Sequence, residues 1–373
     1  MSATKLPASR HSRLLSVDVL RGATIASMIL VNNPGSDVCY AQLDHAAWHG
    51  WTFTDTIFPF FLFITGVSIV LSQANSKAAP AQAYPKILKR TLVLFGIGLF
   101  LNAFPFFDLH TLRIMGILQR IALCYCTAAV LNLRVGPKGR AAWAVALLLV
   151  YWAAMAWYPV PGIGAGSYAK DRNFAAYVDA LFLSGHMWRV SKTWDPEGLV
   201  STLPAIATTL MGTLAGAWLR TERARKSKAA GLAAAGAAGV ALGWAWSLVL
   251  PINKSIWTGS YSVFMAGLAS LALAACYHAI EERGWRGWTG PLEIFGKNSI
   301  TVFVVSGLVG RVLIFGRVHV GDKTRALQEA IFESVFAPYF SPLNASLAYA
   351  LVFVAGLFLL MWGLHKKELY FKV

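Results

Sequence analysis

Charged side chains are scarce in this 373-residue chain. They make up 13% of the residues, against roughly a quarter in a soluble domain, while 57% of the residues are hydrophobic. The mean hydropathy is +0.55, and the apolar residues come in blocks close to the roughly 20 residues that a spanning helix needs. The composition therefore excludes an ordinary soluble domain. It predicts an all-α, polytopic membrane protein whose solvent is the lipid bilayer.

Cysteine is also scarce. The four cysteines include Cys124 and Cys126, which point to different faces of one predicted helix, and Cys276 in another apolar block. This distribution predicts neither a disulfide framework nor a CxxC metal site. An HExxH motif is missing as well, so we expect no metal cofactor.

Acidic residues number 17 against 33 lysines and arginines, which gives a formal net charge of +16. The basic residues gather in alternate connections between the predicted helices, about 21 of them against about 9 in the opposite connections. The positive-inside rule makes the basic connections cytoplasmic. The charge thus reflects membrane topology, and no nucleic-acid partner is expected. Attraction of an anionic cytosolic ligand is a second use for it that stays open.

The apolar blocks indicate about ten membrane spans, with boundaries good to a few residues. An even number places both termini in the cytoplasm. The longest connections, 34–54, 161–197 and 316–343, then lie outside, and loops of such length are often functional. The first apolar run lacks a small-residue cleavage site, so we expect a retained helix rather than a signal peptide. The expected spans are 15–33, 55–74, 87–106, 114–133, 141–160, 198–219, 230–250, 259–280, 293–315 and 344–364.

Polar side chains within or beside apolar blocks are costly in a membrane, which makes each a candidate functional residue. By the predicted topology they fall into a cytoplasmic layer and an outer layer. Asp18 and Arg21 of the cytoplasmic layer stand one helical turn apart and could simply neutralise each other. The outer layer predicts a polar chamber in the outer half of the membrane. Its members are Asn32, Asn33, His45, His49, Asp55, Gln119, Arg120, Asp195, Glu197, Asn253 and Lys254.

Several outer residues also have a structural interpretation. Asp55 and Asp195 stand where predicted helices begin and are good N-caps, because a side-chain oxygen can accept a free first-turn N–H. Arg120 lies deep enough to need a carboxylate or an anionic ligand, and Glu197 or Asp195 could be its structural partner.

The segment "LDHAAWHGWT" (43–52) places His45 and His49 four residues apart. Zinc sites use three or four ligands, and this pair lacks obvious further ones, so a metal site is the weaker interpretation. A neutral imidazole beside asparagines and carboxylates in a partly dry chamber is well matched to accept a proton near neutral pH. We therefore favour His45 as a general base, and an ordinary loop histidine is the alternative.

Several motifs resemble one family, in the order in which that family carries them. "VDVLRG", "ILVNN" and "HAAWHGWTFTDTIFPFFLFITG" precede "GILQRIALCY", "WDPEGLVSTLPAI", "PINKSIWTGSY" and "GKNSI", across residues 14–305. Together they resemble the heparan-α-glucosaminide N-acetyltransferase family of transmembrane acyltransferases. The resemblance to its bacterial members implies a multi-pass protein of the bacterial inner membrane.

The resemblance also implies an acyl-CoA-dependent N-acetyltransferase. Such an enzyme takes acetyl-CoA from the cytosol and delivers the acetyl group to a glucosamine-type amino sugar on the periplasmic side. By position, His45 matches the catalytic histidine of the family and Asn32 the asparagine that works beside it. His49 replaces an expected asparagine, and residues 34–35 replace part of a glycine run. Both departures lie beside the acceptor, so the identity of the acceptor stays open.

Under this hypothesis Asn32 donates a hydrogen bond to the thioester oxygen as it becomes an oxyanion, while His45 deprotonates the acceptor. Glu197 or Asp195 would orient His45 or bind the amine of the sugar. The other residues that we assign to the acceptor pocket or its support are Asn33, Asp55, Gln119 and Arg120.

Coenzyme A would dock at the cytoplasmic face. The sequence contains no glycine-rich phosphate loop, so binding of the nucleotide end would rest on side chains and helix N-termini. The residues that we expect there are Arg21, Lys89, Arg90, Lys297 and Asn298.

Two other classes of function stay open. A transporter for N-acetylglucosamine-like sugars fits the number of spans and the polar cluster, but we find no internal repeat and no paired interrupted helices. A non-catalytic membrane scaffold would leave Arg120 and Asn32 unexplained. We favour the acetyltransferase. The oligomeric state, including a homodimer, is not decided by the sequence.

Overall fold

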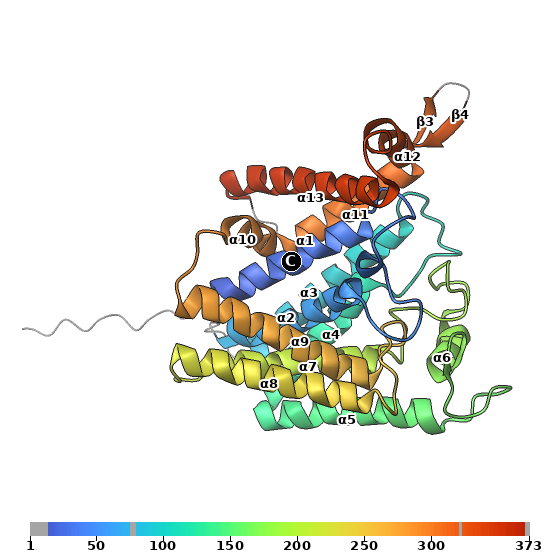
Figure 1. Ribbon diagram of the computed structural model, residues 1–373. Coiled ribbons are helices and arrows are strands. Elements are labelled where there is room, and N and C mark those ends of the chain that lie inside the picture. The colour runs from blue at the N-terminus through green and yellow to red at the C-terminus, as the bar shows by residue number, and fades with distance from the viewer. Residues whose placement is uncertain (1–13, 75–79, 321–322, 370–373) are drawn as a thin grey trace, which may run out of the picture.

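The computed structural model describes residues 14–74, 80–320 and 323–369, and it places a helix over each of the predicted spans (Figure 1). The all-α prediction is confirmed for this bundle. The long helices are α1 (Leu15–Asn32), α2 (Phe53–Ala74), α3 (Pro80–Ala103), α4 (Ile117–Arg134), α5 (Pro137–Trp157), α7 (Thr202–Leu219), α8 (Arg225–Trp246), α9 (Gly259–Tyr277), α11 (Ser299–Phe315) and α13 (Pro342–Lys366).

Judged by their length and composition, fewer helices can cross the membrane than the expected ten. Within the described ranges seven helices are long and apolar enough to cross a bilayer, or eight if the bent pair of α10 (Gly290–Lys297) and α11 counts as one span. The count of ten is therefore not confirmed. Helices α3 and α4 are long enough but more polar, since α3 carries Lys86, Lys89 and Arg90.

The expected span 293–315 is wrong as a continuous helix, because α10 and α11 meet at an angle of 82°. The cause is the close packing of α10 on α1. A Cβ atom on Gly22 would lie 1.8 Å from the carbonyl oxygen of Leu292, and one on Gly296 would lie 2.0 Å from that of Asp18. The two backbones touch at these glycines, so the chain has to turn at Asn298 before α11 can follow the bundle.

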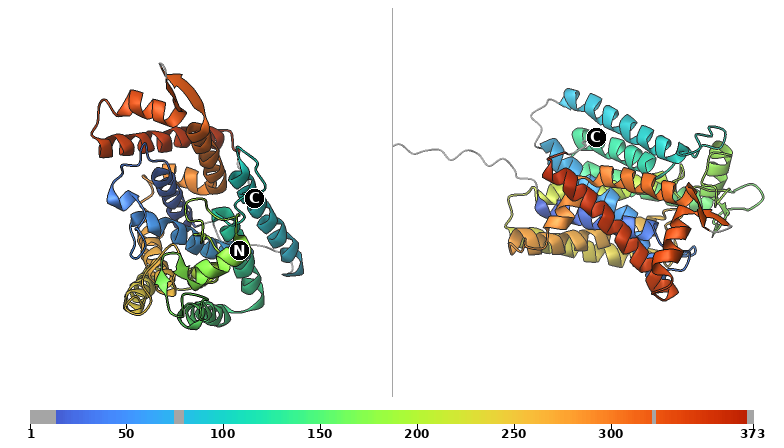
Figure 2. Two further views of the ribbon diagram at one scale, coloured as in Figure 1. Left: turned by 90° about the vertical axis from the view of Figure 1, so that its right-hand side faces the viewer. Right: turned by 90° about the horizontal axis from the view of Figure 1, so that it is seen from above.

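Helices α2 and α7 form the centre of the bundle. A Cβ atom on Gly66 would lie 2.0 Å from the carbonyl oxygen of Thr209, and one on Gly212 would lie 2.0 Å from that of Phe63. Such close approach is typical of helix pairs in membranes, where small residues let backbones meet. Helix α13 covers one flank, while α5 and α8 cover the opposite one (Figures 1 and 2). These outer helices expose large apolar side chains, as lipid contact requires.

The three long connections gather at one end of the bundle, at the right in Figure 1. Two of them contain short antiparallel hairpins, which are the exception to the all-α prediction. The small elements of these connections are η1 (Ala41–Leu43), β1 (Tyr168–Ala169), β2 (Arg172–Asn173), α6 (Phe174–Leu183), β3 (Arg317–Val320), β4 (Lys323–Ala326), α12 (Leu327–Ile331) and η3 (Phe332–Phe336). At the opposite end, α9 continues into the π-helical turn η2 (His278–Glu282).

The glycine contact between α2 and α7 can be tested with Gly66→Ala. A methyl group there meets backbone 2.0 Å away, so we expect a loss of about 1–3 kcal/mol and a lower thermal unfolding midpoint in detergent. Gly96→Ala on α3 is the matched control, because its methyl group meets nothing within 4 Å and alanine favours a helix by about 1 kcal/mol. Equal midpoints for the two variants would contradict this packing.

Candidate active site

His45 and Asp55 form a hydrogen-bonded pair at the end of the bundle where the long connections gather. Nδ1 of His45 lies 2.7 Å from Oδ1 of Asp55. The carboxylate is 1% exposed, whereas the imidazole is half exposed. Because an ionised carboxylate only accepts, Nδ1 carries the hydrogen in this pair. Nε2 is therefore the ring nitrogen that can take up a proton.

Asp55 lies in the first turn of α2, and its second oxygen explains why the loop before the helix is ordered. Oδ2 accepts the backbone N–H groups of Ala46 at 3.1 Å and Thr52 at 3.0 Å, and the Thr52 hydroxyl at 3.2 Å. The N-cap interpretation is wrong for Asp55, because both backbone N–H groups that it accepts belong to residues before α2 and not to the first turn of the helix. One carboxylate closes the loop on the helix and orients His45.

Lys254 completes this group from a distant part of the chain. Its Nζ lies 3.1 Å from each ring nitrogen of His45 and 3.8 Å from Oδ1 of Asp55. Because the two nitrogens are equally distant, the ammonium lies against the ring, and the in-plane lone pair of Nε2 stays open to a substrate. Burial lowers the pKa of Lys254, against the opposing charges of Asp55 and Glu197.

A cavity opens beside this group. At its outer end it is lined by His45, Lys254 and Glu197, and Ser299 at the start of α11 also lines it. Most of the remaining wall is apolar and comes from α1, α2, α4 and α11. These side chains are Ile25, Met28, Val31, Ile57, Phe58, Phe61, Ile117, Leu118, Ile121, Ile300 and Phe303. The cavity therefore presents polar groups at its mouth and a hydrocarbon-like interior.

Asn32 is the last residue of α1 and lines the same cavity as His45. The neighbouring Asn33 is used differently, because its side-chain amide donates to the carbonyl oxygen of Ile29 at 2.8 Å and so finishes the helix. The fold thus brings Asn32 and His45 to one cavity.

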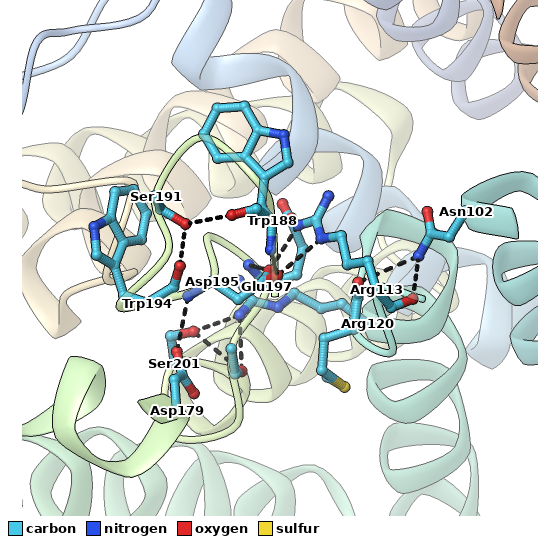
Figure 3. A network of polar contacts seen from close by, with 12 residues as sticks. Asn102, Arg113, Arg120, Asp179, Trp188, Ser191, Trp194, Asp195, Glu197 and Ser201 are labelled. Atoms are coloured by element: carbon cyan, nitrogen blue, oxygen red, sulfur yellow. Dashed lines mark hydrogen bonds and ion pairs between the residues drawn. The ribbon is translucent and has the colours of Figure 1, made fainter. Parts of the chain in front are cut away.

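Arg113 is a functional candidate that the sequence did not reveal (Figure 3). Its Nε and Nη2 donate to the two oxygens of Asp195 at 2.8 and 2.6 Å, and Nη2 also meets Glu197 at 2.5 Å. Burial lowers the pKa of Arg113, but the charges of Glu197 and Asp195 raise it overall. Asp55 is the carboxylate that contacts His45, in place of the expected Glu197 or Asp195.

Asp179 on α6 fixes the turn that carries these acidic residues. It accepts the N–H groups of Asp195 at 3.1 Å and Leu199 at 2.9 Å. A Cβ atom on Gly198 would lie 2.0 Å from Oδ2 of Asp179, so a larger residue at this position would displace the carboxylate. Burial raises the pKa of Asp179 to about 6. This carboxyl group positions the "WDPEG" segment at the cavity mouth.

Arg120 and Gln119 lie behind the cavity wall. The guanidinium of Arg120 is fully buried, donates to the carbonyl oxygen of Gly198 at 3.1 Å and to the hydroxyl of Ser201, and packs on the ring of Trp257. Within the described residues it makes no ion pair, so the expected partnership with Glu197 or Asp195 is wrong. The Arg120 Nε and Nη1 and the Gln119 Nε2 have no hydrogen-bond partner in the described part of the chain.

The cations expected at the cytoplasmic face are partly engaged in protein contacts. Arg21 pairs with Asp18 at 2.9 Å, as the sequence allowed, and also donates to Ser68. Lys297 pairs with Glu293 at 2.5 Å within α10.

The other residues that we expect to bind coenzyme A have different surroundings. Lys89 is exposed on α3, and the neighbouring Arg90 stacks over the ring of Tyr125 at 4.7 Å. Asn298 lies at the bend between α10 and α11, where its Oδ1 is buried without a hydrogen-bond partner among the described residues. It is therefore a feature of the helix break rather than of a continuous span.

The two histidines of the "LDHAAWHGWT" segment have separate surroundings. His49 Nδ1 lies 3.4 Å from the amide of Asn253, and burial lowers the pKa of His49. Between residues 14 and 369, in the parts that the structure describes, no group of three or more potential ligands that could hold a metal ion is gathered. The imidazole of His45 is held by Asp55, whereas that of His49 lies beside Asn253.

Arg113→Ala tests the contact of Arg113 with the carboxylates of Asp195 and Glu197, which together form the acidic rim. Asp195 is fully buried and Glu197 nearly so, and the variant removes the cation that contacts both. Removing one partner of a buried pair costs about 3–5 kcal/mol, and we expect about 2–3 here because Arg113 is itself 21% exposed. Thermal unfolding of Arg189→Ala, an exposed arginine near the same rim, provides the comparison. An unfolding midpoint of Arg113→Ala equal to that of Arg189→Ala would contradict the proposed role.

Comparison with known proteins supports the family that the motifs resemble. The catalytic model of heparan-alpha-glucosaminide N-acetyltransferase matches residues 13–250. The Homo sapiens heparan-alpha-glucosaminide N-acetyltransferase is 30% identical over 351 residues, which cover 78% of this chain and 52% of that protein. The Mus musculus protein of that name is 29% identical over 366 residues, with 82% and 55% covered. The chain spans about half the length of these curated relatives. It belongs to the heparan-α-glucosaminide N-acetyltransferase family.

Proposed function

We propose that the protein is a membrane-bound acetyltransferase that moves the acetyl group of acetyl-CoA to a glucosamine-type amino sugar. The observation that carries the proposal is the His45–Asp55 pair at the mouth of an apolar cavity that Asn32 also lines. Family membership supports the reaction class. The transporter alternative has no comparable support, because transport needs no oriented base.

The cavity fits the thioester end of acetyl-CoA as a substrate. Its interior is apolar, as an arm passing between membrane helices requires, and its polar groups lie at the end that holds Nε2. The basic segments at the other end of the bundle would attract the phosphates of the nucleotide, with Lys89 the most accessible of the expected residues. The nucleotide would then dock in the cytoplasm.

The chemistry follows from the two polar groups beside the cavity. Nε2 of His45 takes a proton from the acceptor amine as its nitrogen attacks the thioester carbon, and the Asp55 carboxylate stabilises the resulting imidazolium. The side-chain amide of Asn32 donates to the developing oxyanion, which is worth about 3 kcal/mol for a well-placed donor. The carbon–sulfur bond then breaks, and the proton returns to the coenzyme A sulfur.

Glu197 supplies the means to bind the acceptor. It lines the cavity mouth, and its contact with Arg113 leaves the carboxylate anchored beside Lys254 and His45. A carboxylate at this position attracts the ammonium group of an amino sugar. Since this end of the bundle carries the connections with fewer lysines and arginines, we place it on the periplasmic side of a bacterial inner membrane.

The proposal predicts that His45→Ala and Asp55→Asn lose acetyl transfer. Removing a general base costs about 10²–10⁴-fold in rate, and the amide variant also loses the charge that supports the imidazolium. Transfer of labelled acetyl from acetyl-CoA to glucosamine by the purified protein measures this. His319→Ala, an exposed histidine on β3, should transfer as the unaltered protein does.

The same preparations distinguish the binding of acetyl-CoA from catalysis. Acetyl-CoA should still raise the unfolding temperature of His45→Ala, because its nucleotide docks far from the imidazole. Turnover of His45→Ala at the rate of the unaltered protein would overturn the proposed mechanism.

A further inference from the structure

The amine of Lys254 lies beside the place that an acceptor amine needs. Its Nζ is 3.1 Å from Nε2 of His45, within the range in which a general base and its proton donor meet. It also lines the cavity into which the thioester would come. Its four-carbon stem is flexible, so the proposal requires only a rotation of this side chain to align Nζ with the lone pair of Nε2.

The loop that carries Lys254 is rigid, so this placement belongs to the fold. Oδ1 of Asn253 accepts the N–H of Ile256 at 3.0 Å, and the fully buried Trp257 anchors the far side of the turn. The carbonyl oxygen of Ile252 accepts the N–H of Gly50 at 2.8 Å, which ties this loop to the segment of His45. The side chain of Lys254 is 19% exposed.

The lysines elsewhere differ from Lys254 in their surroundings. Lys254 is the one lysine among the described residues that line the cavity. Lys89 is exposed on α3, and Lys297 is paired with Glu293 on α10. An acyl donor in the cavity would therefore meet one amine of this protein beside an oriented base.

We propose that Lys254 is an acetylation site of this protein, modified by its own acetyl transfer when no amino sugar is bound. The inference rests on the acetyltransferase function proposed above. Nζ forms a bond to the thioester carbon, and the carbon–sulfur bond breaks. Two protons leave the Lys254 ammonium. One passes through His45 to solvent before the attack, and the other reaches the coenzyme A sulfur, so the products are acetyl-lysine, coenzyme A and one proton.

The modification would switch the site off. Acetylation removes the positive charge that lies 3.8 Å from Asp55 and puts a neutral amide at the cavity mouth, where the acceptor has to enter. Burial lowers the pKa of Lys254 and favours the reactive amine, while Asp55 and Glu197 hold it charged. Self-acetylation should therefore be slower than transfer to a sugar and should dominate when sugar is scarce.

The test incubates the purified full chain with acetyl-CoA and follows acetylation of individual lysines by peptide mass spectrometry. We expect Lys254 to be modified at least tenfold faster than the exposed Lys89. Excess glucosamine should suppress modification of Lys254 and leave Lys89 unaffected. His45→Ala should reduce the rate at Lys254 to that at Lys89. Equal rates at Lys254 in His45→Ala and the unaltered protein would overturn the inference.

Two further variants address the consequence of the modification. Lys254→Gln mimics the neutral acetyl-lysine and should lower transfer to glucosamine at least tenfold, whereas Lys254→Arg keeps the charge and should retain more activity. Unfolding temperatures show that both variants fold. Transfer to glucosamine with Lys254 modified no faster than Lys89 overturns this inference and leaves the proposed function intact. Acetylation of neither glucosamine nor Lys254 overturns both.

Discussion

A carboxylate placed at the head of a membrane helix has to be compensated by the protein itself, because lipid offers no hydrogen bonds. Asp55 meets this constraint with contacts to the backbone of Ala46 and Thr52, to the imidazole of His45 and, at longer range, to Lys254. The same contacts define the loop, the tautomer of the base and the position of the neighbouring cation. The chemistry of the site thus follows from the neutralisation of one buried charge.

The parts of the site that are close in sequence could be predicted, and those that are distant could not. His45 and Asp55 are 10 residues apart, and a helix start next to a polar loop indicates both. Lys254 is 209 residues from His45, and Arg113 is 82 from Asp195. Neither contact leaves a periodic or spaced signal in one sequence. Lys254 was therefore recognised only as a polar residue, and Arg113 not at all.

The fold shows the same division. Apolar block length predicted a helix near each block, with an error of up to seven residues at the start of α3, because each block has to match the bilayer. The bend at Asn298 was invisible, since residues 293–315 read as one apolar run. Its cause is tertiary: Gly22 and Gly296 let α1 and α10 touch, and neither glycine differs locally from the many others in the chain.

Arg120 links the two loops that form the cavity mouth, which explains a buried cation without a carboxylate. On one side its guanidinium donates to Gly198 and Ser201, in the segment that carries Glu197. On the other side it packs on Trp257, in the loop that carries Lys254. A carbonyl dipole and an aromatic face contact the guanidinium directly, and the negative charges of Glu197, Asp195 and Asp179 stabilise it at longer range. Because Arg120 contacts both loops, it fixes the position of Glu197 relative to Lys254.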